Sequence, residues 1–154
     1  MSDIVVKLQQ GYWRQTTNAP GEYVWEFSIC NTTEKDVAAH YMTPKRLSIQ
    51  LTTISGETIP REGIMTTQNL VSDTIHANDE LRYTYKWAMK PTVEESSHPE
   101  IMADLIDENK WPTDFEGRNV TLHVSLLGEY DFKNYSDSPS VESKYTWEHT
   151  IPQR

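Results

Sequence analysis

Residues 81–87, with the sequence Leu-Arg-Tyr-Thr-Tyr-Lys-Trp, decide the fold class of this chain. Large apolar or aromatic side chains occupy every second position, and polar side chains occupy the positions between them. A period of two places one set of side chains on each face of an extended segment, so the pattern predicts a strand with one face in the core. Residues 120–126, with the sequence Val-Thr-Leu-His-Val-Ser-Leu, repeat the pattern and predict a second strand of the same kind.

The same alternation recurs in shorter or less regular form along most of the chain. It is present in residues 4–13, 23–30, 47–52 and 144–150. Turn-forming residues separate these segments: Asn-Ala-Pro-Gly at 18–21, Ser-Gly at 55–56 and a polar stretch at 76–80. Short alternating strands joined by turns are typical of an all-β, immunoglobulin-like antiparallel β-sandwich of about seven to nine strands. We expect one such domain over residues 1–154.

One connection departs from this rhythm, because residues 89–118 separate the two best strands by far more than an ordinary β connection. Within it, His98-Pro99 suits the start of a helix, and Trp111-Pro112 lies just beyond its expected end. Ile101, Met102, Leu105 and Ile106 form an apolar stripe at helical spacing. The spacing therefore predicts one short helix over about residues 98–109. Long connections often carry function, so we expect specificity to reside here.

Composition and charge exclude several classes of protein. The formal net charge of -9 gives a surface that repels phosphate backbones and anionic lipid, so we expect no nucleic-acid partner and no membrane partner. No apolar run approaches the roughly 20 residues of a membrane span. The first residues lack a basic, apolar secretion signal, and Cys30 is a lone cysteine in an apolar stretch. These features predict a soluble, cytoplasmic protein with a buried thiol.

The sequence contains no recognisable catalytic or metal-binding motif. The five histidines lack the spacing of a metal site, and nothing near Cys30 in the sequence marks it as a nucleophile. Asp104, Asp107, Glu108, Asp114 and Glu116 are dense enough to raise calcium as an alternative. The EF-hand spacing is absent, however, and a solvated helix face followed by an acidic loop explains these charges. We therefore expect no cofactor and no enzymatic activity.

Two stretches outside the regular strands offer side chains for binding. Residues 43–46 carry two adjacent basic side chains of the kind that trypsin-like clefts accept, and the alternative is a polar entry into a strand. Residues 111–115 carry two aromatic side chains that either anchor a partner or pack against the sandwich. The candidate binding residues are Thr43, Pro44, Lys45, Arg46, Trp111, Pro112 and Phe115.

Between Tyr23 and Trp87 the chain also carries a particular order of short features. They are Phe27-Ser28-Ile29-Cys30-Asn31-Thr32-Thr33, Thr43-Pro44-Lys45-Arg46-Leu47-Ser48-Ile49, Ser55-Gly56-Glu57, Asn78-Asp79-Glu80-Leu81 and Tyr83-Thr84-Tyr85-Lys86-Trp87, followed later by Leu127-Gly128-Glu129-Tyr130. This order resembles the BsuPI-type intracellular proteinase inhibitor domain, a small β-sandwich family. The chain departs from that family at 78–80, where the family favours Pro-Gly-Glu, and in the long connection after Trp87.

The resemblance implies a chain that presents loops to a serine proteinase, and it transfers no inhibitory residue. Together with the missing catalytic motifs, it predicts a non-enzymatic protein-binding module, with proteinase inhibition through exposed loops as its sharpest form. Two alternatives stay open from the sequence. The many aromatic residues suit a carbohydrate-binding β-sandwich that uses exposed rings, and sandwich edges suit a structural subunit of a larger assembly.

Overall fold

The structure of the chain is a computed structural model, which describes residues 2–16, 19–42, 45–54, 56, 58–59, 71–87, 101–103 and 115–153. The described part is almost entirely β structure. Its strands are β1 (Ile4–Thr16), β2 (Ala19–Asn31), β3 (Val37–Tyr41), β4 (Leu47–Thr53), β5 (Thr58–Ile59), β6 (Val71–Ile75), β7 (Glu80–Trp87), β8 (Ile101–Ala103), β9 (Asn119–Leu126), β10 (Glu129–Phe132) and β11 (Lys144–Thr150). Among the residues described, none forms a helix with the length and hydrophobicity of a membrane span.

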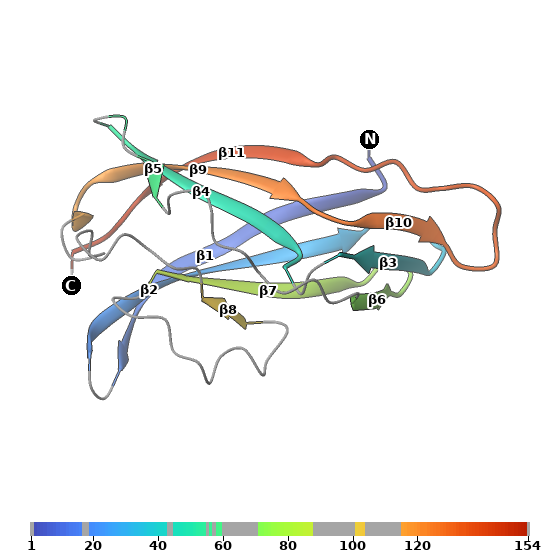
Figure 1. The fold of residues 1–154 in the computed structure, drawn as a ribbon, viewed down its shortest axis with the longest axis horizontal. Helices are drawn as coiled ribbons and strands as arrows, with labels where there is room; N and C mark the ends of the chain where they lie inside the picture. Colours follow the sequence, from blue (N-terminus) through green and yellow to red (C-terminus); the bar gives the residue numbers. More distant parts are fainter. Residues whose placement is uncertain are drawn as a thin grey trace.

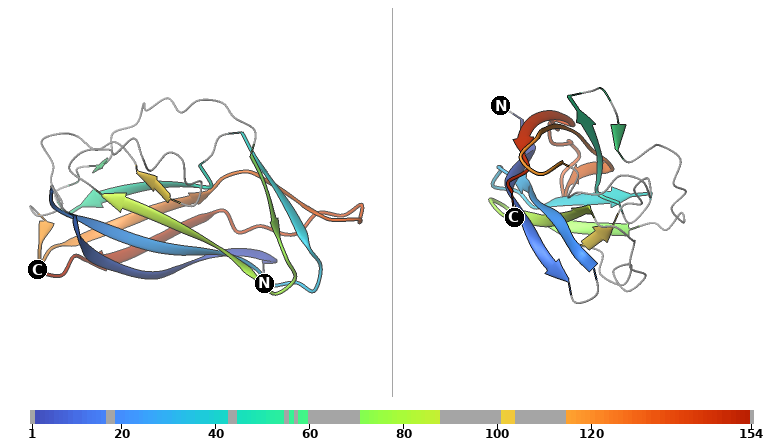
Figure 2. Two further views of the ribbon diagram at one scale, coloured as in Figure 1. Left: turned by 90° about the horizontal axis from the view of Figure 1, so that it is seen from below. Right: turned by 90° about the vertical axis from the view of Figure 1, so that its left-hand side faces the viewer.

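The strands form three sheets, which are consistent with a β-sandwich. One sheet has the order β1-β2-β7-β8, a second has the order β11-β9-β4-β5, and a third, smaller sheet has the order β10-β3-β6. All pairs are antiparallel except β7 with β8. The first and second sheets face each other, and the third lies toward one end of the molecule (Figures 1 and 2).

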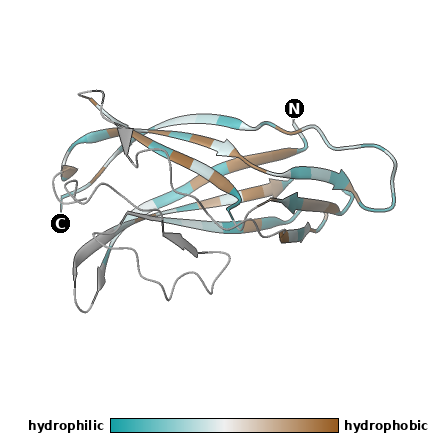
Figure 3. Cartoon of the chain, viewed as in Figure 1, coloured by the Kyte–Doolittle hydropathy of each residue, from teal (hydrophilic) through white to brown (hydrophobic). Residues whose placement is uncertain are grey.

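The core lies between the facing sheets and is built by the alternation seen in the sequence. In β9 and β4 every second residue is buried, and Figure 3 shows the corresponding change between hydrophobic and hydrophilic positions along these strands. From the opposite sheet, β2 contributes Trp25 and Phe27, and β7 contributes Tyr83 and Tyr85, all of them buried. These side chains belong to one continuous cluster, so the predictions of strands at 81–87 and 120–126 are confirmed.

A glycine allows the chain to pass from β9 to β10. Gly128 follows the end of β9 with a φ of 97°, a conformation that side-chain-bearing residues rarely adopt. A Cβ atom at this position would lie 2.6 Å from the ring of Tyr41 in β3. The bare backbone of Gly128 therefore lets β10 pair with β3 while β9 pairs with β4.

Side chains, rather than strand pairing alone, close one long side of the sandwich, where β1 faces β11. The Val6 amide donates to the hydroxyl of Tyr145, and the Trp13 indole donates to the carbonyl of Pro152. The ring of His149 lies over Gly11, where an added Cβ would come within 2.8 Å of the imidazole. The imidazole is also hydrogen-bonded through Nε2 to the hydroxyl of Tyr23.

Two sequence-based predictions are corrected by the strand boundaries. The turn expected at 18–21 is wrong from Ala19 onward, because β2 begins at Ala19 and this residue pairs with Thr16 of β1. Asn18 lies outside the described residues. The helix expected over 98–109 is wrong at Ile101–Ala103, which forms strand β8 beside Thr84–Lys86 of β7. Pairing with a sheet edge satisfies backbone groups there, and this outweighs the helical spacing. The remainder of 98–109 lies outside the described residues.

The half-buried position of His149 makes fold stability depend on pH. Burial lowers the pKa of His149 from its usual value of 6.5. The unfolded chain keeps the ordinary pKa, so it binds a proton before the folded chain does as the pH falls. The stabilisation from neutral His149 is therefore complete above about pH 6.5 and is lost progressively below it.

We expect the free energy of unfolding, measured by urea denaturation, to be lower at about pH 5.5 than at about pH 7.5. The variant His149→Gln keeps an uncharged hydrogen-bonding group opposite Tyr23 and should show a smaller loss over the same interval. Equal losses in the wild type and the variant would show that His149 does not control this transition.

Candidate functional site

The first stretch expected to bind a partner, residues 43–46, is only partly described. Thr43 and Pro44 lie outside the described residues, and Lys45 is half-buried. Arg46 is 5% exposed, and its guanidinium forms two hydrogen bonds of 3.1 Å with the carboxylate of Asp73 in β6. Such a bidentate pair has little capacity left for a partner, so the structure gives Arg46 a role in joining β4 to the small sheet.

Arg46 belongs to a polar cluster that extends to two tyrosines. Its guanidinium lies 5.3 Å from the centre of the Tyr41 ring, and the hydroxyl of Tyr41 lies 3.2 Å from that of Tyr130. The Tyr130 hydroxyl donates to the carbonyl of Leu127. Burial raises the pKa of Tyr41 to about 12 and also raises that of Tyr130. Both phenols are protonated at neutral pH, and the hydrogen bond from Tyr130 to Leu127 has a structural role.

The second stretch, residues 111–115, is described only at its end. Trp111 and Pro112 lie outside the described residues, whereas Phe115 is buried and belongs to the core cluster. Phe115 also lines an open pocket of about 410 Å³ with the exposed Ile54 and with Arg118. The structure thus shows packing for Phe115 and an apolar hollow beside it.

Among the described residues, the positions considered for metal or thiol chemistry add no site. Of the acidic set considered for calcium, only Glu116 is described, and the described residues hold no group of three or more His, Cys, Asp or Glu side chains placed to bind a metal. Cys30 is buried as predicted, and burial raises the pKa of its thiol. A shallow pocket of about 430 Å³ adjoins Cys30, Lys7 and Glu80.

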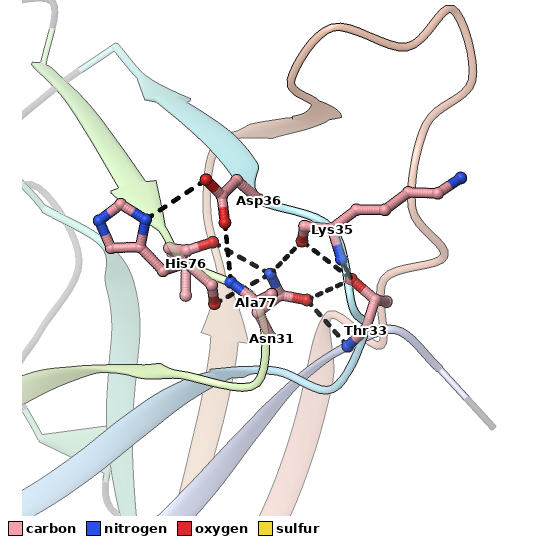
Figure 4. A network of polar contacts seen from close by, with 7 residues as sticks. Asn31, Thr33, Lys35, Asp36, His76 and Ala77 are labelled. Carbon is pink, nitrogen blue, oxygen red and sulfur yellow. Dashed lines mark hydrogen bonds and ion pairs between the residues drawn. The ribbon is translucent and has the colours of Figure 1, made fainter.

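A buried asparagine organises the opposite end of the sandwich from the Phe115 pocket. Asn31, which ends β2, is 2% exposed, and its amide nitrogen donates to the carbonyl oxygens of Lys35, Ile75 and His76 at 2.8, 3.0 and 3.2 Å. Its amide oxygen accepts from both the backbone amide and the hydroxyl of Thr33. Figure 4 shows these contacts, which we call the Asn31 network. The network joins the loop at 32–36 to the loop at 76–79.

Asp36 adds a second link between these two loops. Its carboxylate accepts from the Ala77 amide at 2.9 Å and lies 3.4 Å from Nδ1 of His76. The hydrogen bond from Ala77 and the contact with His76 lower the pKa of Asp36. The backbone also crosses directly, because the Asn78 amide donates to the carbonyl of Thr33. The two loops therefore act as one rigid base.

From this end the chain between β10 and β11 projects beyond the strands (Figures 1 and 2). We call residues 133–140 the apex loop. Its side chains are exposed except that of Pro139. The Lys133 amide donates to the carbonyl of Asp36 at its start, and the Ser140 amide donates to the carboxylate of Asp3 at its end. Both ends of the apex loop are thus fixed to the body of the domain.

The tip of the apex loop, residues 134–137, contacts the base through one lysine. The ammonium of Lys35 lies 4.3 Å from the centre of the Tyr135 ring, 5.0 Å from that of Phe132 and 4.0 Å from the carboxylate of Asp137. The Tyr135 side chain nevertheless remains 55% exposed. Figure 4 shows the Lys35 side chain extending away from Asn31. The arrangement presents an aromatic side chain on a positioned loop.

Sequence reasoning did not identify Tyr135 as a candidate. The serine, aspartate and proline content of Ser136–Ser143 predicts a loop, and Tyr135 precedes this loop without a strand pattern around it. The one feature of the sequence that could have indicated a binding residue here is a single aromatic side chain among polar and turn-forming residues. The partner side chain, Lys35, is 100 positions away in the sequence, so no local pattern shows the contact.

The Asn31 network yields a stability prediction. Replacing Asn31 by Asp would place a carboxylate oxygen against three carbonyl oxygens and remove their shared donor. We expect Asn31→Asp to lower the free energy of unfolding by about 3 kcal/mol in urea denaturation. Asn78→Asp is the matched control, because Asn78 is exposed and Asp tolerates its φ of 56°; its effect should stay within about 0.5 kcal/mol. Similar effects of the two substitutions would contradict a special role for Asn31.

Comparison with known proteins gives no family for this chain. No protein-family model matches it, and no curated protein matches it. It is similar to the X-ray structure of Northeast Structural Genomics Consortium target SoR45, with 11% identity, a TM-score of 0.41 and coverage of 98% of this chain and 87% of that one. A crystal structure of a protein from Archaeoglobus fulgidus shows 9% identity, a TM-score of 0.33 and coverage of 96% of this chain and 100% of that one. At these TM-scores neither likeness carries an argument about function, and the BsuPI-type resemblance stays an inference from sequence.

Proposed function

We propose that the chain is an immunoglobulin-like β-sandwich that works as a non-enzymatic protein-binding module and contacts its partner with the apex loop. The exposure of Tyr135 is the observation that carries this proposal. Tyrosine is among the side chains that contribute most to binding in the centres of protein interfaces, because it combines a large apolar ring with a hydrogen-bonding hydroxyl. An exposed tyrosine on a projecting loop suits that role.

The fixed ends of the apex loop also favour a binding role. A loop that already holds its bound conformation loses less conformational entropy when a partner binds. The contacts of Lys133 with Asp36 and of Ser140 with Asp3 limit the conformations of this loop. The negative surface of the chain favours a protein partner over a nucleic acid or an anionic membrane.

A serine proteinase is the partner class that we propose first, on the basis of the BsuPI-type resemblance. The apex loop supplies a basic and an aromatic side chain, Lys133 and Tyr135, which are the kinds that trypsin-like and chymotrypsin-like clefts accept. It is a better candidate than residues 43–46, because the side chain of Arg46 is held by Asp73.

Site-specific photo-crosslinking tests the binding surface. A photoreactive phenylalanine analogue in place of Tyr135 should form a covalent adduct with a protein partner in cells that naturally express the chain. The same analogue at Glu148, exposed on β11, is the control and should give no such adduct. Equal adducts at both positions, or none at position 135, would contradict docking through the apex loop.

Titration against a panel of trypsin-like and chymotrypsin-like serine proteinases tests the partner class. We expect stoichiometric loss of proteinase activity while electrophoresis shows an intact chain. Tyr135→Ala should weaken inhibition of a chymotrypsin-like enzyme at least about tenfold, as expected when an interface anchor is removed. No inhibition at micromolar protein, or rapid cleavage of the loop, would rule out the inhibitor role and leave the crosslinking result to decide the wider proposal.

A further inference from the structure

We propose that Lys35 acts as a charge latch on the apex loop, and that neutralising its ammonium group by Nε-acylation releases the tip at 134–137. The proposal concerns regulation of the surface described above, and it rests on the proposed function only for its consequence in binding. The latch itself is a property of the folded chain and can be measured without a partner.

The contacts of Lys35 all depend on its positive charge. Attraction to the faces of Tyr135 and Phe132 arises from the ring quadrupoles, and attraction to Asp137 is an ion pair. The ion pair is long, at 4.0 Å, and the side chains of Lys35 and Asp137 are 40% and 62% exposed, so it is weak by itself. The two ring contacts supply the rest of the attraction, and one charge serves all three.

The tip at 134–137 makes few other contacts with the rest of the domain. Within the described residues, the contacts of Lys35 are the ones that link the side chains of 134–137 to the body of the domain. The neighbouring anchors lie on either side of the tip: Lys133 bonds to Asp36, and Ser138 donates to Asp131. Loss of the Lys35 charge should therefore free the tip and leave the ends of the apex loop in place.

The lysine is held in position by its own backbone. Its carbonyl oxygen accepts from the amide of Asn31 at 2.8 Å, and its backbone amide donates to the hydroxyl oxygen of Thr33 at 3.3 Å. The base of the side chain thus belongs to the rigid Asn31 network, while its ammonium remains partly open to solvent. This combination places a chemically accessible amine at a structurally fixed point.

Acylation is the modification that matches this arrangement. The uncharged ε-amine attacks the carbonyl carbon of an acyl thioester, a C–N bond forms, the C–S bond breaks, and the amine proton leaves with the thiol. The resulting amide carries no charge and loses both the ring attraction and the ion pair. An acyl group at Lys133 would remove a charge from the same loop without touching the ring contacts.

The experiment compares full-length chains carrying Nε-acetyllysine at position 35 or at position 133, with Lys35→Arg as a charge-preserving variant. Backbone ¹⁵N relaxation reports the order of residues 134–137. In the wild type and in Lys35→Arg we expect order parameters of about 0.85, and with acetyllysine at 35 we expect values below about 0.6. Acetyllysine at 133 should leave the tip ordered, and β3 and β10 should be unchanged in every chain.

Unchanged order at the tip with acetyllysine at 35 would overturn the latch, as would equal loss of order from acetyllysine at 133. If the latch holds and the proposed function is correct, crosslinking from position 135 should fall about tenfold in the acetylated chain. Release of the tip without any crosslinking partner would support the latch and reject the proposed function. Crosslinking to a partner without release of the tip would support the proposed function and reject the latch.

Discussion

Two crossings between the sheets of this domain lie side by side, and the buried amide of Asn31 holds them together. The chain leaves β2 for β3 at 32–36 and returns from β6 to β7 at 76–79. Loops that cross from one sheet to another leave carbonyl groups without strand partners, and such groups are costly when they are buried. Asn31 donates to two carbonyls of the crossings, those of Lys35 and His76, and to the carbonyl of Ile75 at the end of β6. It thereby fixes the antiparallel pairs β2–β7 and β3–β6 relative to each other.

The same amide has a second consequence at the surface. Because it binds the carbonyl of Lys35, it sets where the Lys35 side chain begins, and that side chain contacts the ring of Tyr135. The buried hydrogen bond from Asn31 to Lys35 thus helps to position the exposed contact between Lys35 and Tyr135. Core packing between β2, β7, β4 and β9 supplies the rigid body on which this depends. The exposed end needs few contacts of its own, since its base is already fixed.

The sequence located the strands β1, β2, β4, β7, β9 and β11, but it did not locate β3, β6, β8 or β10, and it did not show which strands pair. Alternation located 81–87 and 120–126 because each of these strands buries one face. For β2 the same reading gave one buried face, yet Val24 and Ser28 on the other face are also fully buried. A strand between two neighbours can be covered by their long side chains, and Gln9, for example, bonds to Ser28. That cover comes from residues distant in the sequence, so periodicity does not reveal it.

Contacts with residues distant in the sequence also explain why the candidate binding residues were predicted poorly. Arg46 looks exposed in the sequence because it follows Thr-Pro-Lys, but an aspartate in β6 takes its guanidinium into a nearly buried pair. Tyr135 looks unremarkable because its significance comes from a projecting loop and a distant lysine. Charged and aromatic side chains on loops are therefore the residues whose roles local sequence predicts least. The environment of such a side chain depends on which loops the sheets bring together. In this domain the hydrogen bonds of Asn31 hold the loop at 32–36 beside the loop at 76–79.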